Sequence, residues 1–334
     1  MEPGIKIHLN MAGSANFQKE LPTLLIFYAL PNGNTTAQTA GKLFKPGDDW
    51  HYDIQHIAAQ TRFLRKITPE RNVVIAYLEN TLKSWPAWRK ANADKMIPEM
   101  LENIRALCAT NRTEIVLSGH SGGGSLIFGY LNAQEKIPQE IVRIAFLDSN
   151  YAYERSQHHD RKLAEWLSSS ARHYLCVLAY DDASALLDGK SFVSANGGTW
   201  GRSHAMQVDL ANAMQFTSST NSGFQLYSAL DGRVQFNLKE NPERKVLHTV
   251  QVERNGFIHS MLSGTSKESA GYRYFGDRAY SQFIRPNPTN PGWAGDLHQS
   301  PNDDAQYALS QYYGRRPRCV RQNCGHRPRR VRQY

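Results

Sequence analysis

The stretch EIVLSGHSGGGSLIFGYL, residues 114–131, decides the fold. Its first five residues form a short apolar run typical of a buried β-strand, and its last eight form an apolar segment long enough to open a buried helix. Between the two lies the pentapeptide GHSGG, with Ser121 at its centre. A strand, a Gly-x-Ser-x-Gly motif and a helix are the context of a nucleophile elbow, a sharp turn that exposes a serine hydroxyl. The N-terminus of the following helix would offer free N–H groups to a developing oxyanion.

Outward from this motif, apolar strands alternate with helical segments along the chain. We expect strands over residues 5–9 (an edge strand), 22–28, 72–78, 114–118, 141–147, 174–180 and 246–252, and helices over 54–64, 96–107, 124–131 and 163–167. Continuous apolar strands separated by helices predict an α/β fold, in which a mostly parallel central sheet is flanked by helices on both faces. The ligand site of such a sheet lies outside the carboxyl ends of its strands.

Residues with catalytic side chains follow the carboxyl ends of several predicted strands. These residues are Ser121, Asp148, Asp181 and His259. A serine hydroxyl is a poor nucleophile until a neighbouring imidazole takes its proton, and a carboxylate fixes the tautomer of that imidazole and stabilises its cation. The arrangement therefore predicts nucleophilic catalysis at this edge of the sheet.

With this motif, and with nucleophile, acid and histidine in this order, the chain resembles the α/β-hydrolase family over roughly residues 5–275. The resemblance implies a serine hydrolase that cleaves an ester or amide of a small-molecule or acyl substrate through an acyl-enzyme, esterase- or lipase-like rather than peptidase-like. The alternative is an idle scaffold of the same fold that acts as a binding module with a basic tail. The intact Ser121 argues against this alternative.

The preferred base is His259, because it follows the last predicted strand across a glycine-containing loop and opens a helix. His248 falls inside that predicted strand, which argues against it. His204 and His298 lie in loop-like sequence, and we keep both as less favoured candidates for the base.

Two aspartates compete for the role of the acid. Asp148 ends the strand immediately after the elbow unit and is followed by a polar turn that could hold its carboxylate. Asp181 ends the next strand, which is the more frequent place in the family. Adjacent aspartates after a strand are also ordinary turn or helix-cap residues, and we therefore favour Asp148 and keep Asp181 as the alternative.

The oxyanion hole requires two N–H donors near the serine. The N–H of Gly122 follows directly from the elbow motif. The second donor should come from the loop after residues 24–30, where Pro31 has no N–H and leaves Asn32 or Gly33. We choose Asn32, although this loop departs from the His-Gly pair that is usual in the family.

Three aromatic side chains are candidates for the wall of a substrate pocket. Trp85 and Trp88 follow a strand end, where they either line a cleft or pack the loop onto the core. His120 stands beside the serine, and we expect its ring to point away from the catalytic residues.

We expect no cofactor and no metal. The glycine-rich segment 197–201 lacks the spacing of a phosphate loop, and no Gly-x-Gly-x-x-Gly follows a strand. Cys319 and Cys324, with His326 nearby, have too few ligands for a structural zinc site.

We divide the chain into a hydrolase domain over residues 1–275, an extended surface segment over 276–314 and an arginine-rich tail over 315–334. Residues 183–245 are longer than one crossover needs, so they are a candidate cap or lid. The net charge of +9 comes largely from eight arginines in the tail. We interpret the tail as a disordered end and do not expect it to contact nucleic acid or an anionic surface.

The sequence predicts no membrane span, because it has no apolar run of 18 residues. The apolar run at residues 24–30 is too short and lacks the flanks of a secretion signal. We expect a cytoplasmic location by default, and a secreted mature form whose leader has been removed stays open. The oligomeric state is not predicted.

Overall fold

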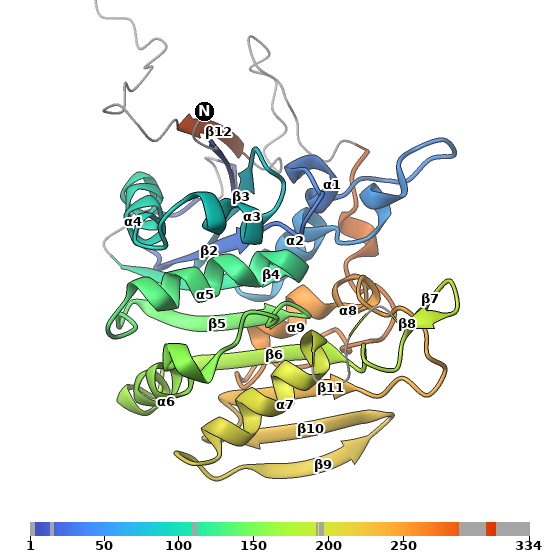
Figure 1. Cartoon of the computed structure of the whole chain (residues 1–334). Helices are drawn as coiled ribbons and strands as arrows, with labels where there is room; N and C mark the ends of the chain where they lie inside the picture. Colours follow the sequence, from blue (N-terminus) through green and yellow to red (C-terminus); the bar gives the residue numbers. More distant parts are fainter. Residues whose placement is uncertain are drawn as a thin grey trace, which may run out of the picture.

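The computed structural model describes residues 4–13, 17–108, 112–191, 193, 197–286 and 305–311. The predicted arginine-rich tail and most of segment 276–314 lie outside these ranges. The described residues form one large sheet with the order β12-β1-β3-β2-β4-β5-β6-β11-β10-β9 and a separate hairpin, β7-β8 (Figure 1). The strands are β1 (Ile5–Met11), β2 (Thr23–Ala29), β3 (Asn72–Asn80), β4 (Thr113–His120), β5 (Ile141–Leu147), β6 (Tyr174–Tyr180), β7 (Leu186–Leu187), β8 (Lys190–Ser191), β9 (Thr217–Asn221), β10 (Phe224–Ala229), β11 (Val234–Lys239) and β12 (Ala305–Gln311).

The central strands run parallel, from β3 through β2, β4, β5 and β6 to β11. At the outer edges β1, β12, β10 and β9 pair antiparallel. This arrangement confirms the predicted fold class, a mostly parallel sheet. Within the described ranges, β1 is not the edge strand that we expected, because β12 pairs with its outer side.

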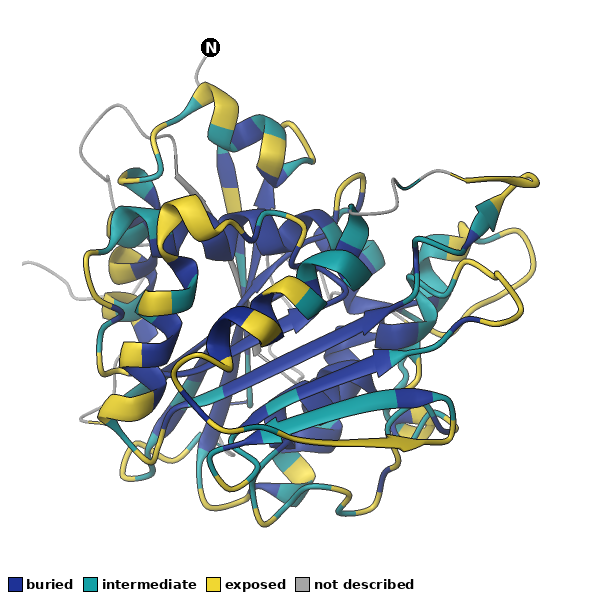
Figure 2. Ribbon diagram, turned by 60° about the horizontal axis from the view of Figure 1, so that its bottom comes forward, coloured by how far each residue is buried: buried dark blue, intermediate teal, exposed yellow. Residues whose placement is uncertain are grey.

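Helices cover both faces of the sheet. They are α1 (Thr36–Ala40), α2 (Ile57–Ile67), α3 (Trp85–Ala91), α4 (Met96–Cys108), α5 (Gly124–Ala133), α6 (His159–Ser169), α7 (Gly198–Leu210), α8 (Val250–Glu253) and α9 (Gly256–Leu262), with short 3₁₀ turns η1 (Trp50–Asp53), η2 (Ser121–Gly123), η3 (Arg155–Gln157) and η4 (Ser281–Phe283). Helices α3 to α7 enclose one apolar cluster against the sheet, and α2, α8 and α9 enclose a second cluster on the opposite face. The strands of the parallel centre are therefore buried, whereas the edge strand β9, many turns and the outer sides of helices are exposed (Figure 2).

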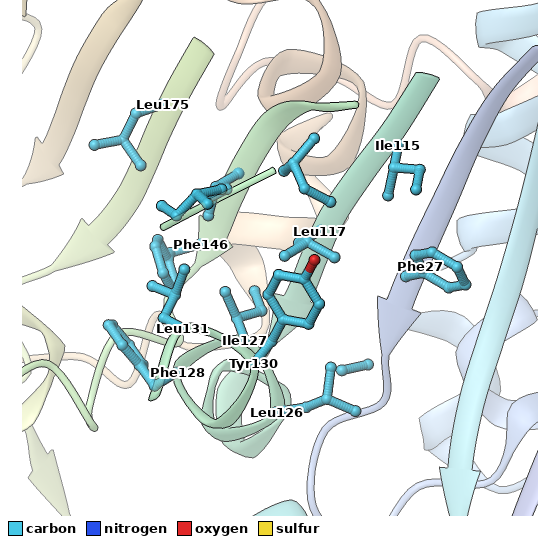
Figure 3. Packing of buried hydrophobic residues seen from close by; sticks show 14 of the residues in the cluster. Phe27, Ile115, Leu117, Leu126, Ile127, Phe128, Tyr130, Leu131, Phe146 and Leu175 are labelled. Atoms are coloured by element: carbon cyan, nitrogen blue, oxygen red, sulfur yellow. The ribbon is translucent and has the colours of Figure 1, made fainter. Parts of the chain in front are cut away.

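Helix α5, which follows the serine motif, is fixed to the sheet by apolar packing. Leu126 and Ile127 are at most 1% exposed, and they pack in one cluster with Leu117 and Phe146 of the neighbouring strands (Figure 3). Burying a side chain of this size stabilises the fold by about 1.5–3 kcal/mol. This packing holds the start of α5 at the carboxyl end of β4.

The structure contradicts the predicted strand over residues 246–252. Residues 250–253 form α8, and Val246 is exposed. The last parallel strand is instead β11, which pairs with β6 on one side and β10 on the other. The apolar residues of 246–252 alternate as they do in a strand. In the structure, however, both sides of β6 are already paired, with β5 and with β11.

Most of segment 183–245 is not a cap or lid. Helix α7 packs in the apolar cluster of the sheet, and β9, β10 and β11 extend the sheet itself. In this segment, the short hairpin β7-β8 is separate from the main sheet. The segment is long because it contains a crossover helix and three further strands.

The start of α5 requires glycine, because other backbone lies against it. A Cβ atom at Gly124 would overlap the carbonyl of Ser149, and one at Gly123 would overlap the carbonyl of Ala29. We expect Gly124→Ala to lower the free energy of unfolding by about 1–3 kcal/mol, since backbone must move to make room. Urea unfolding would measure this loss, with the exposed Glu135→Ala as a control within about 0.5 kcal/mol of the native chain. Native stability in Gly124→Ala would contradict the close packing.

Candidate active site

Ser121 stands at the turn between β4 and α5, as the sequence predicts for an elbow. Its backbone φ is 55°, in the left-handed region that residues other than glycine rarely adopt. Such a conformation costs of order 1–3 kcal/mol and is found most often at functional sites. The side chain is partly exposed, at the carboxyl end of the central strand of the parallel sheet.

The loop after β2 brings Asn32 to the elbow. A Cβ atom at Gly122 would overlap the Asn32 side chain, so the two residues are in direct contact. The N–H of Gly33 donates to the carbonyl of Lys83 at 2.8 Å and is therefore not free to bind an oxyanion. Of the two donors left open by the sequence, the hydrogen bonding favours Asn32.

A buried carboxylate fixes the far end of the same loop. Glu79, 7% exposed, accepts hydrogen bonds from the Thr36 N–H at 2.8 Å and from the Thr36 hydroxyl at 2.9 Å. The contact joins the end of β3 to the start of α1, and it anchors the end of the loop that carries Asn32.

Asp148 follows β5 and is fully buried. Its backbone φ is 47°, and its N–H donates to the carbonyl of Leu178 at 2.7 Å. One carboxylate oxygen accepts a hydrogen bond from the Thr199 hydroxyl, and the other lies 2.5 Å from Nδ1 of His248. The carboxylate is therefore held on both oxygens and faces a histidine.

That histidine is not the one we predicted. His248 lies in the loop between β11 and α8, and its side chain is 23% exposed. The sequence argues against His248 because it falls inside the strand predicted over residues 246–252, and the structure has no strand there. Along the chain, His248 still follows Ser121 and Asp148, and it comes after the last parallel strand, β11.

His259 lies instead in a buried network away from Asp148. Asn237 donates to its Nε2 at 2.6 Å, and its Nδ1 lies 3.2 Å from the Tyr272 hydroxyl. Its ring stacks on Tyr274, with centroids 4.8 Å apart. Burial lowers the pKa of His259 to about 4, so the ring is neutral. The prediction that His259 meets Asp148 is wrong.

His120 faces His248 and does not point away from it. The two rings are 4.5 Å apart, and Nε2 of His120 donates to the carbonyl of His248 at 3.1 Å. Because a carbonyl only accepts, the proton of the neutral ring is on Nε2. Burial holds the pKa of His120 well below its usual value. The residue next to Ser121 therefore fixes the backbone of His248.

Asp181 is an ordinary turn residue, which is the other role that the sequence allows for it. One of its carboxylate oxygens accepts from the Ser184 N–H at 3.0 Å. The next residue, Asp182, is 1% exposed and accepts from the N–H groups of Thr199 and Trp200, at 2.8 and 3.1 Å. Asp182 thus caps the start of α7 and places the Thr199 hydroxyl on Asp148.

Stability should depend on pH through Asp182. Burial, and then the neighbouring Asp148, raise the pKa of Asp182 to about 6. Because the folded protein keeps this proton to a higher pH than the unfolded chain does, the contribution of Asp182 to stability falls as the pH rises from about 4 to about 6. We expect Asp182→Asn, which cannot ionise, to gain up to about 3 kcal/mol relative to the native chain over this interval. Parallel unfolding curves from pH 4 to pH 7 measure the difference, and a constant difference would contradict it.

Trp85 and Trp88 pack in the core rather than line a pocket. Each is 1% exposed, and their rings pack edge to face, 5.5 Å apart, within the apolar cluster under α5. His204 is occupied by the Trp200 carbonyl at 3.0 Å and by Gln225 at 3.1 Å. His298 lies outside the described residues.

Within the described ranges, no group of three or more His, Cys, Asp or Glu side chains could hold a metal ion. In the same part of the chain, no helix is both long and apolar enough to cross a membrane. Cys319, Cys324 and His326 lie outside the described residues.

Comparison with known proteins gives little beyond this geometry. No family model matches the chain, and no curated protein matches its sequence. Among solved structures, the chain is similar to the siderophore hydrolase EstB from Aspergillus nidulans, with a TM-score of 0.40 and 10% sequence identity. The match covers 78% of this chain and 90% of that chain. Because the likeness is weak, we base the reaction on the site itself.

Proposed function

We propose that the chain is a serine hydrolase that cleaves an ester or amide through an acyl-enzyme, with esters preferred over peptides. Ser121 is the nucleophile, His248 the base and Asp148 the acid. The observation that carries this proposal is the buried Asp148 carboxylate at 2.5 Å from His248 Nδ1, together with the strained backbone of Ser121, whose φ is 55°.

The chemistry follows from these positions. Asp148 holds the proton of His248 on Nδ1, which leaves Nε2 to accept the proton of the Ser121 hydroxyl. The serine oxygen attacks the carbonyl carbon, and the N–H groups of Gly122 and Asn32 stabilise the oxyanion. The leaving alcohol or amine takes the proton from Nε2. Water, activated by the same imidazole, then releases the acid and restores the serine.

The position of His120 supports this assignment of the base. Its hydrogen bond to the His248 carbonyl joins the base loop to the residue beside the nucleophile. Gly124 and Ser149 are in contact, which joins the acid loop to the start of α5. The three loops that carry the proposed triad are therefore fixed to one another by short contacts.

Replacing each aspartate by asparagine tests whether Asp148 or Asp181 is the acid. We expect Asp148→Asn to lower turnover of p-nitrophenyl esters by about 10⁴, because the amide leaves the imidazole in the wrong tautomer. Asp181→Asn should lose only its turn contact, costing about 1 kcal/mol of stability and little turnover. Initial rates with p-nitrophenyl acetate and butyrate, together with circular dichroism of both variants, provide the measurement. A larger loss in Asp181→Asn than in Asp148→Asn would reverse the assignment.

A panel of short and long acyl esters and of peptide amides tests the bond type. We expect turnover of esters, and turnover of peptides alone would contradict the preference for esters. A fluorophosphonate that labels Ser121 in the same preparations would still support the serine mechanism.

A further inference from the structure

A second site lies at the opposite edge of the sheet from Ser121. There the amino ends of β2 to β6, together with the last turns of α2 and α9, enclose a pocket of about 440 Å³. Its floor is one row of side chains on the same face of the sheet, in which Arg143 pairs in register with Val116 on one side and Tyr174 on the other. Pockets of about 300–1,000 Å³ are the usual size of small-molecule sites.

The pocket is cationic. Its lining includes two carboxylates, Glu70 and Glu114, and five cations, Arg71, Arg112, Arg143, Arg172 and Lys267. Both carboxylates are already paired with cations of the lining. Glu114 lies 3.2 Å from Arg71 and 3.4 Å from Arg172, and Glu70 lies 3.3 Å from Lys267. An excess of positive charge is therefore left for a ligand.

Arg143 is the unusual member of this lining, because it is 4% exposed and has only neutral hydrogen-bond partners. It donates to the carbonyls of Ser260 and Ser263, at 3.1 and 2.9 Å, and to the Ser263 hydroxyl at 3.0 Å. The Tyr174 ring covers one face of the guanidinium at 4.5 Å. In the part of the chain that the structure describes, no carboxylate pairs with it. The carboxylate of Glu268 acts on Arg143 only from beyond ion-pair distance. A buried charge without a directly paired counter-charge is unfavourable, and an anion in the pocket would stabilise the guanidinium.

Part of the wall is apolar. Leu64 of α2 and Met261 and Leu262 of α9 line the pocket, and each is at most 5% exposed. A ligand that uses the whole pocket therefore needs both an anionic group and an apolar body. A guanidinium fits a carboxylate well, because its parallel N–H groups match the two oxygens.

We propose that this pocket binds a small organic carboxylate with an apolar body, with its head group at Arg143 and its approach guided by Arg71 and Arg172. The site is separate from Ser121 and does not depend on the proposed hydrolase activity. The ligand would contact α9 and the start of β5, at the opposite ends of the parallel strands from Ser121.

Isothermal titration of the full chain with octanoate tests the proposal. We expect octanoate to bind at least about 10-fold more tightly than octanamide, because a charge-assisted hydrogen bond is roughly twice as strong as a neutral one and the amide has no charge. Arg143→Met should weaken octanoate binding about 10-fold or more. Because Arg143 also holds the end of α9, the exposed Arg172→Ala serves as a second variant that keeps the fold, with an expected weakening of about 3-fold. Arg105→Ala, a cation outside the pocket, is the matched control and should bind as the native chain does.

Three results would overturn the proposal. They are no octanoate binding by the native chain, equal binding of octanoate and octanamide, and unchanged binding in Arg172→Ala and in any folded Arg143→Met. Measuring the same titrations in Ser121→Ala keeps the outcome independent of hydrolysis, because that variant leaves every lining residue of the pocket in place.

Discussion

Ser121→Ala is expected to abolish hydrolysis, lowering kcat by about 10⁶, because the variant has no oxygen that can form the acyl-enzyme. The residual rate would come only from the oxyanion hole and from substrate binding. The fold should survive, since the hydroxyl is partly exposed and alanine adopts the same backbone at the same cost as serine. Initial rates with p-nitrophenyl butyrate and thermal unfolding of the same preparation measure both effects. If more than about 10% of the activity remained, the nucleophile would be elsewhere.

The second large expected effect on turnover distinguishes His248 from His259 as the base. His248→Ala should lower kcat by about 10⁵–10⁶, since the serine then has no base and the leaving group has no acid. His259→Gln is the matched control, because it changes a buried histidine whose ring nitrogens face Asn237 and Tyr272 rather than Asp148. We expect this control to lose stability, as Asn237 and Tyr272 lose a partner, and to keep turnover within about 10-fold once folded.

Rates for the two histidine variants are compared at a temperature where circular dichroism shows both to be folded. Activity that survives His248→Ala and disappears in folded His259→Gln would contradict the assignment of the base. Activity that survives in both would show that neither histidine acts on Ser121.

The parallel centre of the sheet could be predicted from the sequence because its strands are continuous apolar runs. Buried strands with helices on both faces leave this signal in every segment, and β2 to β6 all carry it. The antiparallel extension could not be found in the same way. Strand β9, TSSTN, is exposed along its length, and β10 and β11 alternate apolar with polar residues.

One signal for β11 was nevertheless present. The residues Leu230-Asp231-Gly232-Arg233 separate two alternating runs, and Asp-Gly between such runs indicates a hairpin. With this hairpin, β11 is the last strand, and the first histidine after it is His248. The prediction of His248 as a candidate base therefore depends on a turn signal rather than on an apolar run.

The place of Asp148 after the strand next to the elbow predicts it as the acid, and in the structure His248 lies beside its carboxylate. What the sequence could not supply is the support of Asp148, because Thr199 and Asp182 come from α7 and from the end of β6. These contacts join residues up to 51 positions apart. They arise from the packing of α7 on the sheet. No local pattern in the sequence around Asp148 predicts this packing.

Labelling with a fluorophosphonate, followed by peptide mass spectrometry, tests the central claim most directly. The probe forms a covalent bond to a serine only where that serine is activated as a nucleophile, and the measurement needs no knowledge of the substrate. We predict one adduct, on Ser121, that disappears in Ser121→Ala, is strongly slowed in His248→Ala and forms at a near-native rate in folded His259→Gln. No labelling of the folded native chain, or labelling that depends on His259 and not on His248, would contradict the proposed active site.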